Sequence, residues 1–136
     1  MQPNFSLNWG YTYIGMDRPR GKGSFEHLLY QDIIRKSQQK EGMETHIEGR
    51  MKNGSKLIDI LSFSKETGFV AYEVTLHFEN LISNIKEDLH DGVSEVVIVT
   101  RDKEDLEKAK KMVKEDPITA KYQEKIVFET IDAFFS

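Results

Sequence analysis

The chain has 136 residues, of which 38% are hydrophobic, so it is long enough for one domain with a buried core and too short for two ordinary domains. Charged residues make up 31% of the chain but nearly balance, and the formal net charge of −4 excludes a protein whose whole surface binds a polyanion. The absence of cysteine excludes disulfide scaffolds, thiolate zinc sites and cysteine nucleophiles.

Residues 1–23 are predicted to form an N-terminal arm outside the core domain, which we place at residues 24–136. The arm combines an aromatic stretch, "PNFSLNWGYTYI", with a loop-like stretch, "GMDRPRGKGS". It lacks the layout of a signal peptide, and no apolar run in the chain reaches the roughly 18–20 residues of a membrane span. We therefore expect a soluble cytoplasmic protein with no membrane partner. The aromatic residues of the arm fit a homodimer contact or docking in a larger multidomain assembly as readily as they fit a cover for the core.

The core is predicted to begin with a helix over residues 25–42, because Phe25, Leu28, Leu29 and Ile33 recur at helical spacing. Ser24 is a suitable N-cap residue for it. Three short strands follow at residues 43–49, 55–63 and 68–76, separated by the turn-like stretches "RMKNG" and "SKETG". Three strands in succession predict an antiparallel meander.

The second half alternates helices with strands. We expect a helix over residues 78–92, a central strand over 94–100, a charged helix over 101–117, and a last strand with a short terminal helix over 124–135. The predicted fold is α/β: a three-layer-like sandwich with a central mixed sheet, built from an αβββαβ core and a C-terminal α-β-α extension.

Two carboxylates are predicted to face each other across the second hairpin. If residues 64–68 form its turn, a symmetric register pairs Phe63 with Phe69 and then brings Asp59 opposite Glu73. Like charges in apolar surroundings require a cation, and Mg²⁺ or Mn²⁺ bound by two carboxylates meets that need. The alternative is that Glu73 faces solvent at the edge of the sheet, or forms an ion pair with Lys56 or Arg50.

The order of elements, with "IDI" on the second strand and "EVT" on the third, resembles the PD-(D/E)XK (restriction endonuclease-like) nuclease superfamily over residues 24–100. The resemblance implies that Asp59 and Glu73 bind the catalytic metal. It also implies that Glu26 is the additional acid on the first helix found in the resolvase-like branch. The alternative is a structural role, because an acid in the first turn of a helix is stabilised by the positive end of the helix dipole. The same segment resembles, more weakly, the C-terminal domains of some mobile-element and conjugation-type ATPases.

Thr75 departs from the superfamily pattern, because it stands where the motif has a lysine that steadies negative charge at the phosphate. Three residues could supply the missing charge: His77 on the same predicted face, Lys56 across the hairpin, and Lys86 on the following helix. The sequence leaves the choice open. The candidate catalytic residues are therefore Asp59, Glu73, Thr75, His77 and Lys56.

DNA is the expected partner, and its phosphates require a local cluster of cations. The best candidate is "RPRGKG", which contains Arg18, Arg20 and Lys22. We expect His27 to be an ordinary surface or half-buried histidine. Asn80 and Asn84, one turn apart, could share a helix face toward the site, or Asn80 could cap that helix.

The sequence thus predicts a metal-dependent DNA endonuclease-like domain that cleaves or binds DNA. The alternative is a catalytically inactive nuclease-fold module that binds DNA or mediates assembly in a mobile-element or secretion machine.

Overall fold

In a computed structural model, which describes residues 24–54 and 56–135, five strands form one mixed sheet in the order β1-β2-β3-β4-β5. The strands are β1 (Glu44–Gly49), β2 (Ile58–Ser64), β3 (Gly68–Thr75), β4 (Glu95–Thr100) and β5 (Ile126–Thr130). The first three are antiparallel neighbours, whereas β4 and β5 run parallel to β3. The predicted meander and mixed sheet are confirmed.

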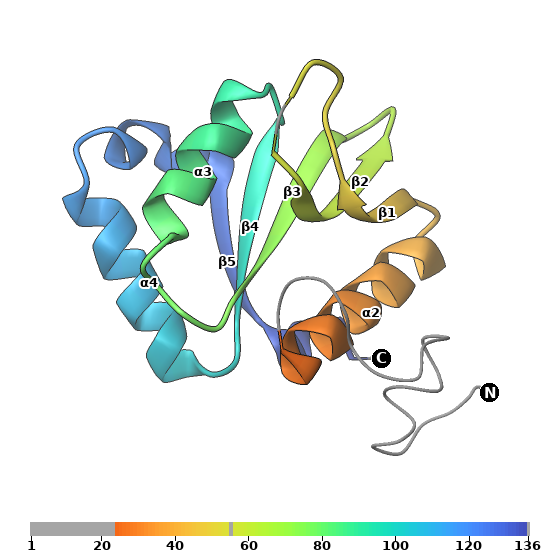
Figure 1. The fold of residues 1–136 in the computed structure, drawn as a ribbon, viewed down its shortest axis with the longest axis horizontal. Helices are drawn as coiled ribbons and strands as arrows, with labels where there is room; N and C mark the ends of the chain where they lie inside the picture. Colours follow the sequence, from red (N-terminus) through yellow and green to blue (C-terminus); the bar gives the residue numbers. More distant parts are fainter. Residues whose placement is uncertain (1–23, 55, 136) are drawn as a thin grey trace.

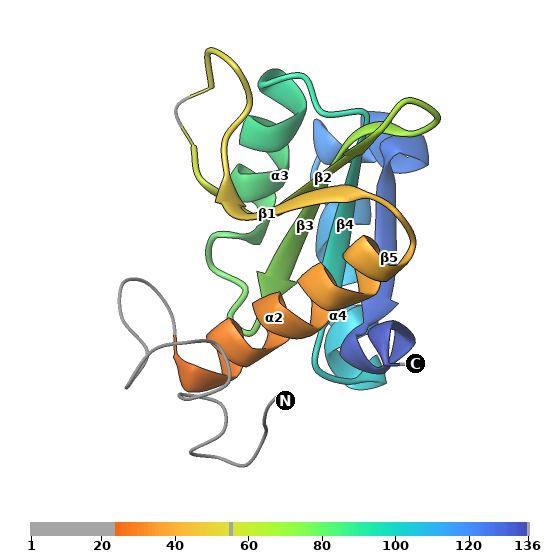
Figure 2. The same cartoon turned by 90° about the vertical axis from the view of Figure 1, so that its right-hand side faces the viewer.

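Helices cover both faces of this sheet (Figure 1). One face carries α2 (Phe25–Lys40) and the short 3-10 helix η2 (Ile131–Phe134). The other carries α3 (Leu81–His90), α4 (Lys103–Glu115) and the 3-10 helix η1 (Thr119–Lys125). The view turned by 90° shows α2 and α3 on opposite sides of the strands (Figure 2). The α/β prediction is therefore confirmed. Among the helices of residues 24–54 and 56–135, none has the length and apolar character that a membrane-spanning helix needs.

Two apolar cores follow from the alternation of side chains along the strands. Toward α3 and α4, Leu61 and Ala71 pack with Ile85 and Ile98. Toward α2, Ile60 and Tyr72 pack with Ile34 and other residues of the second cluster. β3 lies between β2 and β4, so both of its edges are paired, and helices cover both faces of the sheet (Figure 1). A polar side chain on β3 is therefore buried unless it lies near the end of the strand.

The register of the second hairpin agrees with the prediction. Phe63 pairs with Phe69, Leu61 with Ala71, and Ile60 with Tyr72. Gly68 closes the turn with a φ of 74°, a left-handed conformation that a glycine adopts without strain. The paired register ends at Ile60 and Tyr72, one position before the two acids, and Asp59 and Glu73 both line one pocket just beyond it.

Candidate functional site

A pocket of about 810 Å³ opens where β2 and β3 meet the N-terminal ends of α2 and α3. Its lining combines acidic and basic residues. They are His27, Glu48, Arg50, Lys56, Asp59, Glu73, His77 and Glu87. Asn80 and Asn84 also line it, and the Asn80 side chain makes no capping hydrogen bond to α3. Of the two roles considered for Asn80, the structure therefore favours the one in the pocket.

Glu73 reaches this pocket from the middle strand and is only 3% exposed. The alternative prediction that Glu73 faces solvent at the edge of the sheet is therefore wrong. Its carboxylate instead binds Lys56, with 2.5 Å between Glu73 Oε2 and Lys56 Nζ. The ion pair with Lys56, one of the alternatives left open by the sequence, is the contact that the structure contains.

Lys56 lies in the connection between β1 and β2 and is shared by two acids. Its ammonium is 3.1 Å from Oδ1 of Asp88 on α3, and it donates to the carbonyl of Leu57 at 3.2 Å. The side chain of Lys56 is 12% exposed, and that of Asp88 is fully buried. A lysine ammonium has three donors, and these contacts with Glu73, Asp88 and Leu57 match that number.

Burial and neighbouring charges shift the ionisation of Glu73 and Lys56. Burial raises the pKa of Glu73 well above its usual range, the neighbouring Asp88 and Asp59 raise it further, and Lys56 opposes them. Burial alone would lower the pKa of Lys56, but the charges of Glu73 and Asp88 outweigh burial, and its pKa is raised. The ammonium therefore stays charged, while Glu73 gains a proton more readily than an exposed glutamate.

Asp59 also lines the pocket, and its carboxylate has two contacts. Its Oδ2 accepts a hydrogen bond from the backbone N–H of Val74 at 2.8 Å and lies 3.3 Å from Nε2 of His27. The hydrogen bond to Asp59 raises the pKa of His27, and burial opposes that rise. His27 is half-buried, which is one of the two positions that the sequence predicted, and it also contacts one of the two acids.

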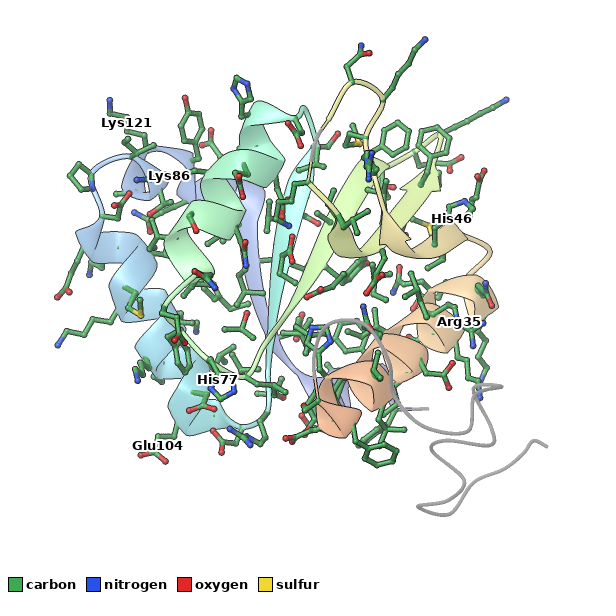
Figure 3. The ribbon with its side chains drawn as sticks, in the orientation of Figure 1. Arg35, His46, His77, Lys86, Glu104 and Lys121 are labelled. Atoms are coloured by element: carbon green, nitrogen blue, oxygen red, sulfur yellow. The ribbon has the colours of Figure 1, made fainter. Side chains whose placement is uncertain are left out.

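Two further predicted residues lie close to the acids. His77 lines the pocket just beyond the end of β3, and Figure 3 shows it where the chain leaves the sheet. Thr75 is 5% exposed, and its hydroxyl donates to the carbonyl of Glu73 at 3.3 Å. The Thr75 side chain is not part of the pocket lining. Among the three residues that could replace the motif lysine, Lys56 is the one that contacts Glu73.

Glu26 and Lys86 are not brought to the acidic pair. The Glu26 carboxylate accepts a hydrogen bond from Tyr30 at 2.9 Å and lies 3.2 Å from Nη1 of Arg101. Lys86 instead lies 3.5 Å from Asp116, on the side of α3 that faces η1 (Figure 3). Neither residue lines the pocket.

The predicted arm and its DNA-binding candidates, Arg18, Arg20 and Lys22, lie outside the described residues. Asp88 is a residue of the charged cluster that we did not predict from the sequence. Its signal was present, because Asp88 shares the buried stripe of α3 with Leu81 and Ile85. An acid at a core position of an amphipathic helix indicates a buried cation nearby.

Two carboxylates of this pocket, Asp59 and Glu73, are of the type that could hold a divalent ion. Within residues 24–54 and 56–135, no group of three or more histidine, aspartate or glutamate side chains is arranged to hold a metal. Mg²⁺, however, keeps several waters and binds through one or two carboxylates together with substrate phosphates. Asp59 and Glu73 provide those carboxylates, and the ammonium of Lys56 already occupies a cation position at Glu73.

Comparison of the chain with protein-family models, with curated proteins and with solved structures found no match in any of the three.

Proposed function

We propose that the pocket is the active site of a metal-dependent endonuclease that hydrolyses DNA phosphodiesters. The observation that carries the proposal is the position of Lys56, whose ammonium lies 2.5 Å from Glu73 in the pocket that also contains Asp59. The chain thus has two acids and one lysine at a single site, although the lysine comes from the β1–β2 connection and Thr75 stands at the motif position.

Each residue has a separate role in this proposal. Asp59 and Glu73 would hold Mg²⁺ or Mn²⁺, which supplies Lewis-acid polarisation of the phosphodiester and lowers the pKa of a bound water. Lys56 stabilises the negative charge that develops on the phosphate oxygens, as a preorganised cation does in a site that excludes water. His27 keeps Asp59 in one orientation through the contact between Nε2 and Oδ2.

The test is incubation of the full chain with plasmid, linear and branched DNA in the presence of Mg²⁺ or Mn²⁺. We expect cleavage by the wild type, loss of cleavage with EDTA, and loss in Asp59→Asn and Glu73→Gln. Glu66→Gln, which removes a carboxylate from the exposed turn between β2 and β3, is the matched control and retains cleavage. Cleavage that survives both Asp59→Asn and Glu73→Gln would overturn the assignment of the site.

A second candidate function is a catalytically inactive module that binds DNA or assembles with other proteins. It is favoured by the way Lys56 offsets the charges of Glu73 and Asp88 without any added ion, while Glu26 contacts Arg101. This candidate predicts DNA binding with a steep salt dependence and no cleavage with either metal.

A further inference from the structure

Asp88 shares the ammonium of Lys56 with Glu73, and the two acids differ in what else they can contact. Glu73 lines the pocket, whereas Asp88 does not. Asp88 is 0% exposed and belongs to the buried stripe of α3. A ligand in the pocket therefore meets Glu73 and Lys56 but has no direct access to Asp88.

The ion pair with Lys56 is the contact that offsets the charge of Asp88. Nζ of Lys56 lies 3.1 Å from Oδ1 of Asp88, and a hydrogen bond between the carboxyl groups of Asp88 and Glu73 contributes to the raised pKa of Glu73. An isolated buried carboxylate is costly, so Asp88 holds the ammonium strongly. Lys56 therefore has two alternative acidic partners, one reachable from the pocket and one not.

This arrangement matters when a divalent ion binds Glu73. The ion and the ammonium compete for one carboxylate and repel each other at short range. Without a second acid, the flexible lysine side chain would leave for solvent. With Asp88 3.1 Å away, the ammonium can remain beside the pocket while Glu73 binds the ion.

We propose that Asp88 is a positioning residue, which retains Lys56 in the pocket when Glu73 gives its carboxylate to a divalent cation. The inference rests on the proposed function, because it assumes that the cation binds Glu73. It goes beyond that function by assigning a role to a residue that touches neither the substrate nor the ion.

The test follows the exposure of Lys56 directly and does not depend on activity. The full chain is labelled with an amine-acylating reagent with and without Mg²⁺, and labelling of each lysine is followed by peptide mass spectrometry. We expect slow labelling of Lys56 in the wild type under both conditions. In Asp88→Asn, Mg²⁺ should make labelling of Lys56 about tenfold faster, because the displaced ammonium has no second partner.

Three controls separate positioning from general effects. Labelling of Lys86, which lies outside the pocket, reports reagent activity in every sample. Glu87→Gln removes an exposed charge from the rim of the same pocket and should leave Lys56 protected. Asp88→Glu keeps the carboxylate and should restore protection, and Asp88→Ser repeats the test if the amide variant does not fold.

Two results would overturn the inference: Mg²⁺-dependent labelling of Lys56 in the wild type, or equal protection in the wild type and Asp88→Asn with Mg²⁺ present. DNA cleavage measured on the same samples separates the two proposals. If the wild type cleaves DNA but Lys56 is labelled at the same rate in the wild type and in Asp88→Asn, the proposed nuclease function stands and the proposed role of Asp88 does not.

Discussion

Glu73, Asp88 and Lys56 place two negative charges and one positive charge in a nearly closed space. The side chains of the two acids are 4% and 0% exposed, and that of the lysine is 12% exposed. Burying such charges is unfavourable unless each has a partner, and removing one partner leaves an uncompensated charge. The stability of the domain and the chemistry of its pocket therefore depend on the same three residues.

Lys56→Met should destabilise the domain by about 3–5 kcal/mol, because it leaves Glu73 and Asp88 without their cation. The measurement is the free energy of unfolding in urea. Lys86→Met is the matched control, since Lys86 has a 36% exposed side chain and forms only a surface ion pair with Asp116. That substitution should cost no more than about 1 kcal/mol.

The double variant Lys56→Met/Asp88→Asn should recover most of the stability that Lys56→Met loses, because it removes one positive and one negative charge together. If the loss of unfolding free energy in the double variant equals the sum of the losses in the two single variants, the two residues do not share an ion pair. This variant also keeps the net charge of the wild type, which makes it useful for functional tests.

The raised pKa of Glu73 predicts a pH-dependent stability in metal-free buffer. Between the ordinary glutamate pKa of 4.5 and the higher value in the folded protein, the native state binds more protons than the unfolded chain. Stability therefore falls as the pH rises through this range. Glu73→Gln has no proton to lose at this position, so its free energy of unfolding should increase relative to that of the wild type from pH 4.5 to pH 7.

Urea unfolding at several pH values in EDTA measures the difference in unfolding free energy between Glu73→Gln and the wild type. Glu66→Gln is the control, because it makes the same substitution at an exposed position on the turn. A difference between Glu73→Gln and the wild type that does not change with pH would show that Glu73 titrates like an exposed glutamate.

At the level of single residues, the sequence predicted the positions of Asp59 and Glu73, because a strand has a strict period of two and the hairpin turn fixes the register. It did not select Lys56 over His77 and Lys86. Lys56 lies in the connection between β1 and β2, where no repeating apolar pattern shows which way a side chain points. Its side chain is placed by a tertiary contact with Asp88 on α3.

Among the elements, the end of β1 contributes Glu48 to the pocket lining, and Arg50 follows directly after the last residue of the strand, Gly49. A Cβ at Gly49 would lie 2.8 Å from Cβ of Leu61, an atom fixed to the backbone of β2. The close approach of β1 to β2 at this point therefore requires a residue without a side chain.

Gly49→Ala should destabilise the domain by about 1–3 kcal/mol, because the added methyl group pushes β1 away from the buried Leu61. Thermal unfolding measures the effect. Gly42→Ala is a useful comparison, since its Cβ would meet nothing within 4 Å and the change adds only the strain of a φ of 86°. Full stability in Gly49→Ala would contradict the close approach of the two strands.

The α-helices and the strands β2 to β5 were predictable from periodicity, since most of them have an apolar stripe or alternation that matches their face of the core. The 3-10 helix η1 was not predicted. Its segment, "TAKYQEK", has no repeating apolar pattern, and it is held instead by contacts such as the hydrogen bond from the Thr119 hydroxyl to the carbonyl of Val113 at 2.8 Å.

For the whole molecule, a net charge of −4 means that the proposed binding of DNA would require a local cationic region. Replacing Arg18, Arg20 and Lys22 with glutamine should weaken DNA binding. It should also reduce the slope of log K against log salt concentration by about 0.9 for each phosphate that the protein no longer neutralises. Fluorescence anisotropy with labelled duplex DNA at several salt concentrations measures both quantities.

The matched control replaces Lys103, Lys110 and Lys111 on α4 with glutamine, because that helix balances its cations with acids. Equal reductions of affinity and slope in the two triple variants would contradict a specific role for the arm.

Whether Lys56 supplies the positive charge that Thr75 lacks is decided by the rate of DNA cleavage by Lys56→Met/Asp88→Asn in saturating Mg²⁺. We expect this folded, charge-balanced variant to cleave at least about 10²-fold more slowly than the wild type, whereas Lys86→Met stays within about twofold of it. Cleavage by the double variant at the wild-type rate would contradict the role of Lys56.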